Sequence, residues 1–141
     1  MANDGGDFAR SMSIATSGLR AQAGRMRVIS ENIANADSTA PTAAGDPYRR
    51  KIPTFSSELD RTLDAKVVAL GKVRPDASAF RVKHEPGNPA ADAAANVKYP
   101  NVNPLIEMTD MRDAQRSYEA NLNIISATRR MIQRTLDILK T

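Results

Sequence analysis

The chain has 141 residues, of which 41% are hydrophobic, 26% charged and 4% aromatic, and its formal net charge is +4. This length and balance are typical of one soluble domain, and the absence of cysteine excludes disulfides, thiolate nucleophiles and cysteine-ligated metals. With no Trp, the composition favours helices packed through Leu, Ile, Met and Ala over a core of large rings.

After a flexible start (residues 1–6), residues 7–39 are predicted to form an N-terminal helix. Its core-forming positions recur at alternating steps of four and three, the 3.5-residue repeat of a coiled coil. These positions are Phe8, Met12, Ala15, Leu19, Gln22, Met26, Ile29 and Ile33. Gly18 and Gly24 each cost about 1 kcal/mol relative to alanine inside a helix. We therefore expect this helix to depend on a packing partner.

The middle of the chain, residues 40–104, is predicted to consist of loops and short strands, because all eight prolines lie in it. Three strands and one short helix are expected: strands at Arg50–Phe55, Lys66–Arg74 and Ala79–His84, and a helix at Ser57–Ala65. Pro53 confines the first strand to a sheet edge. In the third, Phe80 and Val82 alternate with basic residues, which predicts one apolar and one hydrated face.

Residues 105–141 are predicted to form a C-terminal helix, since they include no proline and no glycine. Asn103 suits the N-cap and Pro104 the first helical position. One apolar stripe follows this helix: Met108, Met111, Tyr118, Leu122, Ile125, Ile132, Leu136 and Leu139. At about 1.5 Å per residue the helix would be roughly 50 Å long, more than one small domain needs. Part of the stripe is therefore expected to contact another subunit.

These patterns predict a mainly α fold, with long N- and C-terminal helices paired as a coiled coil and a small loop- and β-rich middle segment. We expect pairs of helices from neighbouring subunits to bundle together. The residues expected in the helix seam or in subunit contacts are Leu19, Met26, Ile29, Ile33, Met108, Tyr118, Leu122, Ile125, Ile132 and Leu136.

No group of side chains in the sequence predicts catalysis, a cofactor or a metal ion. The single histidine, His84, is expected on a surface turn rather than as a general base. Glu107, Asp110 and Asp113 lie three residues apart and could flank a divalent cation, although a solvated helix face near the positive end of the dipole explains them as well. Glycine-rich phosphate-binding patterns are absent. The sequence predicts a protein that is not an enzyme.

A cytoplasmic helical adaptor or a nucleic-acid-binding coiled coil is the alternative from another class. Arginines gather on both helices, as at Arg27 and Arg130. Acids such as Glu31 and Glu119 interrupt them, which argues against one basic face. A salt-sensitive affinity for DNA would support this alternative.

The first residues contain no apolar core of signal-peptide length, and the longest apolar run in the chain is Val67–Leu70. We therefore expect neither a cleaved signal peptide nor a transmembrane segment. If the protein leaves the cytoplasm, it must do so by another route.

The end of the first helix resembles the amino-terminal signature of bacterial flagellar rod and hook proteins. The likeness lies in Gly18 and in the stretch from Val28 to Ser38, whose signature positions are Asn32, Ile33, Asn35 and Asp37. As a plain pattern, the asparagines also suit an ordinary helix terminus. At the far end, Glu107–Met108 and Arg116–Asn121 resemble the carboxy-terminal helix of the same family.

Residues 84–92 and 97–103 are similar to the middle segment of the proximal rod subunits of that family. The turn residues of this segment are Glu85, Pro86, Gly87, Asn88 and Pro89. The short middle also fits a proximal subunit, because distal rod and hook proteins have larger central domains. This segment favours one proximal subunit of the family, and another proximal rod subunit is the nearest alternative.

The resemblance implies a structural subunit that is exported through the flagellar type III apparatus and assembled helically into the periplasmic rod of the basal body. That rod transmits torque from motor to hook. The implied partners are further copies of the chain, the rod proteins FlgB, FlgF and FlgG, FliE and the membrane ring. The resemblance implies no nucleic acid, small-molecule substrate or cofactor.

Overall fold

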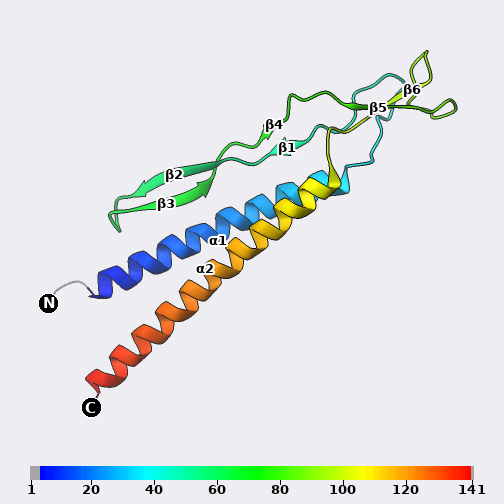
Figure 1. The fold of residues 1–141 in the computed structure, drawn as a ribbon. Coiled ribbons are helices and arrows are strands. Elements are labelled where there is room, and N and C mark those ends of the chain that lie inside the picture. The colour runs from blue at the N-terminus through cyan, green and yellow to red at the C-terminus, as the bar shows by residue number, and fades with distance from the viewer. Residues whose placement is uncertain (1–3, 141) are drawn as a thin grey trace. The chain divides into compact units, whose positions relative to one another are not determined.

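The structure, a computed structural model, describes residues 4–140. A long helix stands at each end of the chain and six short strands lie between them (Figure 1). The elements are α1 (Asp4–Ala34), β1 (Lys51–Ile52), β2 (Phe55–Asp60), β3 (Ala65–Leu70), β4 (Arg74–Pro75), β5 (Arg81–His84), β6 (Asn96–Tyr99) and α2 (Pro104–Leu139). The predicted mainly α fold with a small strand-containing middle is confirmed at this level.

The first helix differs from its predicted range at both ends. It begins at Asp4, so part of the segment expected to be flexible is helical, while residues 1–3 of that segment lie outside the described residues. It ends at Ala34, after which the chain turns. In that turn the Ser38 N–H donates to the Asn35 carbonyl at 3.2 Å.

The chain divides into two compact units, and both helices contribute to each. Within the described residues, the first unit comprises 4–26, 54–72 and 113–140, and the second comprises 27–53 and 73–112. Each unit has its own strands. The first holds the β2–β3 hairpin, and the second holds the β1–β4 and β5–β6 pairs.

The hairpin of the first unit replaces the short helix that was predicted for Ser57–Ala65, and that prediction was wrong. Strands β2 and β3 pair antiparallel from Phe55 opposite Leu70 to Asp60 opposite Ala65. The Asp60 carboxylate accepts the Thr62 N–H at 2.9 Å, which closes the turn. Cross-strand pairing with the β-branched pair of β3 therefore overrides the local helical tendency of Ser57–Ala65.

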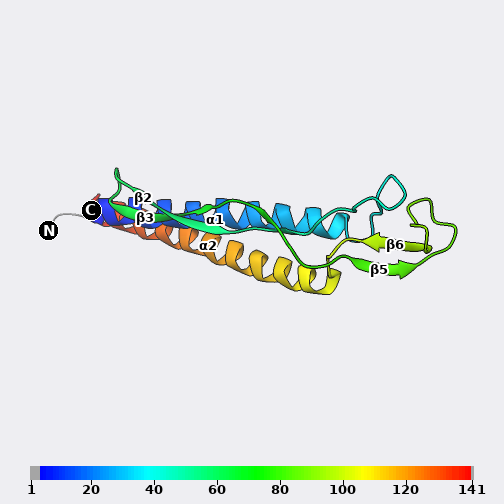
Figure 2. The same ribbon diagram turned by 90° about the horizontal axis from the view of Figure 1, so that it is seen from above.

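In the second unit, β5 and β6 run side by side (Figure 2) and pair antiparallel, with Arg81 opposite Tyr99. Of the predicted apolar face of the third strand, Phe80 is half-buried beneath the Arg49 guanidinium, but Val82 is 60% exposed and all four residues of β5 are exposed. Burial falls on β6 instead, where Val97 and Tyr99 pack with Ala90. Strand β6 thus carries the small core of this pair.

Candidate functional site

The most enclosed polar side chain of the second unit is Asn32, in the last turns of α1. It is fully buried, and its amide makes all four hydrogen bonds available to it. Its Nδ2 donates to the Lys51 carbonyl at 2.8 Å and to Glu107 Oε2 at 3.0 Å. Its Oδ1 accepts the Lys51 N–H at 2.9 Å and the Tyr48 hydroxyl at 2.8 Å. One signature residue thereby joins α1, the segment before β1 and α2.

Glu107, in the first turn of α2, is the second buried member, with 1% of its surface exposed. Its Oε1 accepts a hydrogen bond of 2.6 Å from Arg50 Nε. A buried carboxylate is tolerated only when it is paired and hydrogen-bonded, and both of its oxygens are. We call Asn32, Tyr48, Arg50, Lys51 and Glu107 the polar junction.

Arg50 connects the polar junction to two further acids. Its Nη1 lies 3.4 Å from Asp76 Oδ2 and its Nη2 lies 3.8 Å from Asp110 Oδ2. Burial acts to lower the pKa of Arg50, but the hydrogen bonds and charges of Glu107 and then Asp76 together outweigh it and raise that pKa. Glu107 and Asp110, two of the three acids considered as a cation site, therefore face a guanidinium. Within residues 4–140, no group of three or more metal-binding side chains is close enough to hold an ion.

The side chain of Tyr48 is half-buried. Burial, and then the negative charges of Glu31 and Glu107, raise the pKa of Tyr48 to about 12. Its hydroxyl stays protonated across the physiological range and so remains a donor to Asn32. Beside it, the Lys51 ammonium pairs with Glu31.

The other signature residues close the end of α1. The Asn35 amide donates to the Glu31 carbonyl at 2.8 Å, and Ile33 is half-buried. Arg81 Nη2 donates to the Ala36 carbonyl at 2.7 Å and lies 3.6 Å from Asp37 Oδ1. Strand β5 thus binds a carbonyl in the turn that follows α1.

The start of α2 carries the cap that the sequence predicts. Asn103 Oδ1 accepts the Leu105 N–H at 3.1 Å, and Pro104 is the first helical residue. Proline fits there because the first N–H of a helix has no partner within it.

The turn from Glu85 to Pro89 is held by its own side chains. Pro86 precedes Gly87, whose φ is +110°, the arrangement of a type II turn. Asn88 Nδ2 donates to the Glu85 carboxylate at 2.9 Å, and the Tyr99 hydroxyl donates to it at 3.0 Å. These hydrogen bonds hold the pKa of Glu85 below its usual value.

In the first unit, Gly18 is buried against Asn121 of α2. A Cβ at this position would lie 2.7 Å from Asn121 Nδ2, closer than such atoms approach. Gly24 meets Leu70 of β3 in the same way, at 2.8 Å. Both glycines therefore allow close packing, which explains why the helix accepts their cost in helical stability.

The structure distributes the expected seam residues unequally between the two helices. In α1, Ile29 is buried and Leu19, Met26 and Ile33 are half-buried. In α2, Tyr118, Ile125 and Ile132 are half-buried, whereas Met108, Leu122 and Leu136 are 50%, 42% and 47% exposed. Eight of the less exposed positions of α2 form one row with steps of four and three: Glu107, Met111, Ala114, Tyr118, Asn121, Ile125, Thr128 and Ile132.

Sequence reasoning missed four of these positions, namely Glu107, Ala114, Asn121 and Thr128. They are small or polar, so a search for large apolar residues passes over them. The seven-residue spacing of Glu107, Ala114, Asn121 and Thr128 was the available signal.

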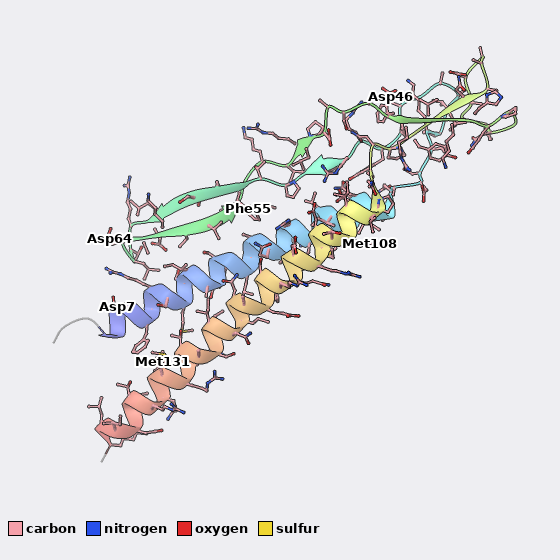
Figure 3. The ribbon with its side chains drawn as sticks, in the orientation of Figure 1. Asp7, Asp46, Phe55, Asp64, Met108 and Met131 are labelled. Atoms are coloured by element: carbon pink, nitrogen blue, oxygen red, sulfur yellow. The ribbon has the colours of Figure 1, made fainter. Side chains whose placement is uncertain are left out.

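Outside that row, α2 keeps many large apolar side chains in contact with solvent. We call the following residues the outer apolar set: Leu105, Ile106, Met108, Leu122, Ile124, Met131, Leu136 and Leu139. Their exposures run from 42% for Leu122 to 78% for Leu139, and Figure 3 labels Met108 near the start of α2 and Met131 in its second half. None of the described helices combines the length and the apolar character needed to cross a membrane.

Comparison with known proteins assigns both ends of the chain. Residues 12–40 match the family described as flagella basal body rod protein, and residues 93–138 match the flagellar basal body rod FlgEFG protein C-terminal family. Over 127 residues the chain is 54% identical to flagellar basal-body rod protein FlgC of Agrobacterium fabrum, covering 90% of this chain and 91% of that protein. The chain belongs to the FlgC family.

More distant FlgC proteins agree. The FlgC protein of Bacillus subtilis is 38% identical and covers 92% of this chain and 97% of its own length. The FlgC protein of Salmonella typhimurium is also 38% identical, over 89% of this chain and 92% of that protein. The predicted flagellar rod family is confirmed, and the name these relatives share resolves which rod subunit the chain resembles.

Membership of the FlgC family makes the chain a structural subunit of the flagellar basal-body rod and not an enzyme. The polar junction joins the two regions that match rod families, since Asn32 lies in the first and Glu107 in the second. Through these hydrogen bonds the polar junction fixes the end of α1 against the start of α2.

Proposed function

We propose that this rod subunit assembles helically through its two terminal helices, and that the outer apolar set of α2 is covered by neighbouring subunits. The observation that carries the proposal is the exposure of eight large apolar side chains on one helix. Large exposed apolar side chains in this number on one element favour a contact with another macromolecule. A head-to-tail contact that does not close produces a helical array of subunits.

We also propose that α1 and α2 pair as a coiled coil. Support comes from the rows of less exposed residues, which follow steps of four and three on both helices. Contacts support it within each unit, through Gly18 with Asn121 in the first and Asn32 with Glu107 in the second. Small residues in such a seam let helices approach closely, and a polar residue fixes the register.

The place of the subunit is proposed from its family. We place it in the proximal, periplasmic part of the rod, next to FlgB, FlgF, FlgG, FliE and the membrane ring, where it passes torque towards the hook. Export through the flagellar type III apparatus suits the chain, because Gly18 and Gly24 lower the intrinsic helical stability of α1. The absence of disulfides also leaves the chain free to pass through a narrow channel unfolded.

The test places a charge in the outer apolar set. Leu122→Asp introduces a carboxylate at an exposed position, so the free chain should remain folded and soluble, whereas burial of that carboxylate between subunits would be strongly unfavourable. Asn123→Asp is the matched control, since it adds the same group at an exposed polar neighbour. Both are expressed in a flagellate strain that lacks its own FlgC.

The expected result is that the native chain and Asn123→Asp restore swimming and appear in purified basal bodies, while Leu122→Asp does neither. Circular dichroism of the purified chains checks that all three have the same helix content. Normal incorporation of Leu122→Asp into basal bodies would refute the assignment of this surface.

A further inference from the structure

The β2–β3 hairpin has one covered edge and one open edge. The Val68 N–H points out of the hairpin and donates to Ser17 Oγ of α1 at 3.2 Å. Strand β3 is accordingly the strand next to α1, and β2 lies on the other side of the hairpin (Figure 1). Five of the six residues of β2 are exposed. The edge of β2 is therefore an unpaired strand edge, which proteins normally cover or block.

The hydrogen-bond pattern tells which backbone groups of β2 face outwards. Because the N–H of Val68 points away from β2, its partner Ser57 belongs to a non-hydrogen-bonded pair. The Gly71 N–H donates to the Thr54 carbonyl at 2.6 Å, which fits the same alternation. The N–H and C=O groups of Phe55, Ser57 and Leu59 consequently point to the open edge.

The side chains of these three residues share one face of the strand, because strand side chains alternate. Phe55 is 45% and Leu59 58% exposed. Figure 3 places Phe55 at the start of β2 and Asp64 in the turn beyond it. The open edge therefore combines unpaired backbone groups with two large apolar side chains.

We propose that the open edge of β2 binds the same edge of a second copy of this chain, in an antiparallel pair centred on Ser57. This register sets Phe55 opposite Leu59 of the other copy at both ends of the pair, and each apolar–aromatic pair stabilises a sheet. It uses all three outward-facing residues and forms about six backbone hydrogen bonds. The result is one continuous sheet made of two hairpins.

Charge favours a second copy as the occupant. In this register Glu58 lies opposite Ser56 of the other copy and Asp60 lies opposite Thr54, so no acid faces an acid. Shifting the pair by two residues in either direction loses one of the hydrogen-bonded pairs and separates Phe55 from Leu59. The edge is thus complementary to itself in one register.

The contact is a weak one on its own, because a single strand pair buries far less than the roughly 1,600 Å² of a standard interface. The pair relates the two copies by a two-fold axis, unlike the head-to-tail contact of a helical array, so it is a contact between chains in solution. It is separate from the helix surfaces and does not depend on the proposed rod assembly.

Cysteine cross-linking of the full chain tests the pair directly, because the chain has no cysteine of its own. In Ser57→Cys the two introduced residues would face each other at about 5.5 Å between Cα atoms, within disulfide range. In the control Ser56→Cys, the introduced residues would lie diagonally, about 7–8 Å apart, beyond that range. Diamide serves as the oxidant: it takes two protons and two electrons from the two thiols and is reduced to the hydrazine.

We expect about tenfold more disulfide-linked dimer from Ser57→Cys than from Ser56→Cys on a non-reducing gel, because only the former is within reach. In a second experiment, an excess of the native chain, which has no cysteine, is added as a competitor and should lower the cross-linking of Ser57→Cys. The same excess of Ser57→Pro should not lower it. Proline there keeps the hairpin's own hydrogen bonds but lacks the outward N–H. Equal cross-linking of the two cysteine variants, none from Ser57→Cys, or equal competition by Ser57→Pro would overturn the proposal.

Discussion

At the scale of single residues, Asn32 shows why a signature position requires one amino acid. Its two donors and its acceptor oxygen are all used, by partners in two other parts of the chain, residues 48–51 and Glu107. Aspartate would lose both donors and set a second carboxylate beside Glu107. A buried network of this kind stabilises one arrangement only when every member is satisfied.

Tyr48 makes this network sensitive to alkaline pH. Its pKa is raised from 10.0 to about 12 in the folded chain, so folding favours the neutral phenol. The contribution of Tyr48 to the free energy of unfolding is therefore fully present below pH 10 and is lost as the pH rises from 10 through about 12.

The prediction is that phenolate absorbance of the native chain, after subtraction of Tyr48→Phe, titrates with a midpoint at about pH 12. In strong denaturant the same difference should titrate at the ordinary value of a tyrosine. Coincident midpoints in the two conditions would contradict the buried donor role of the hydroxyl.

At the scale of elements, α2 shows which features an apolar sequence pattern predicts and which it does not. Its existence, its cap at Asn103 and half of its row of less exposed residues follow from the sequence. Met108, Leu122 and Leu136 were grouped with that row because hydrophobicity alone cannot distinguish packing within a chain from packing between chains. The residues actually buried are Glu107, Ala114 and Thr128, and the partners of Glu107, which are Asn32 and Arg50, are distant in sequence.

The hairpin was harder to predict for a similar reason. Residues 57–65 contain no strong strand former, and β2 exists because it pairs with β3. The sequence of one segment alone does not determine which other segment it pairs with. The turn at Glu85–Pro89, by contrast, is local and could be recognised from its Pro-Gly pair.

Gly18 allows the contact between α1 and α2 to be tested. Gly18→Ala alone should destabilise the chain even though alanine favours a helix by about 1 kcal/mol, because its Cβ would meet the Asn121 side chain at 2.7 Å. In an Asn121→Ala background the collision is gone, so the same substitution should stabilise.

Urea unfolding of the four chains in this double-mutant cycle measures the effect. The free energy of unfolding of the double variant should exceed the value expected from adding the two single effects by about 1 kcal/mol or more. Additive effects would show that Gly18 and Asn121 do not pack against each other.

At the scale of the whole molecule, the chain carries more apolar surface than it can bury by itself. One row of α2 is shielded within the chain, and the outer apolar set is left to solvent. Low aromatic content and abundant Leu, Ile and Met suit this arrangement, since flexible apolar side chains adapt to several neighbours. The central claim is that these exposed residues become the contacts of the rod.

Hydroxyl-radical footprinting of the methionines tests that claim most directly, because oxidation follows side-chain exposure. Met108 and Met131 are 50% and 54% exposed, and the half-buried Met111 is the internal reference. In the free chain, Met108 and Met131 should oxidise faster than Met111; in rods isolated from cells, both should fall to the rate of Met111 or below it. If Met108 and Met131 keep their free-chain rates in the isolated rods, the outer apolar set is not the assembly surface.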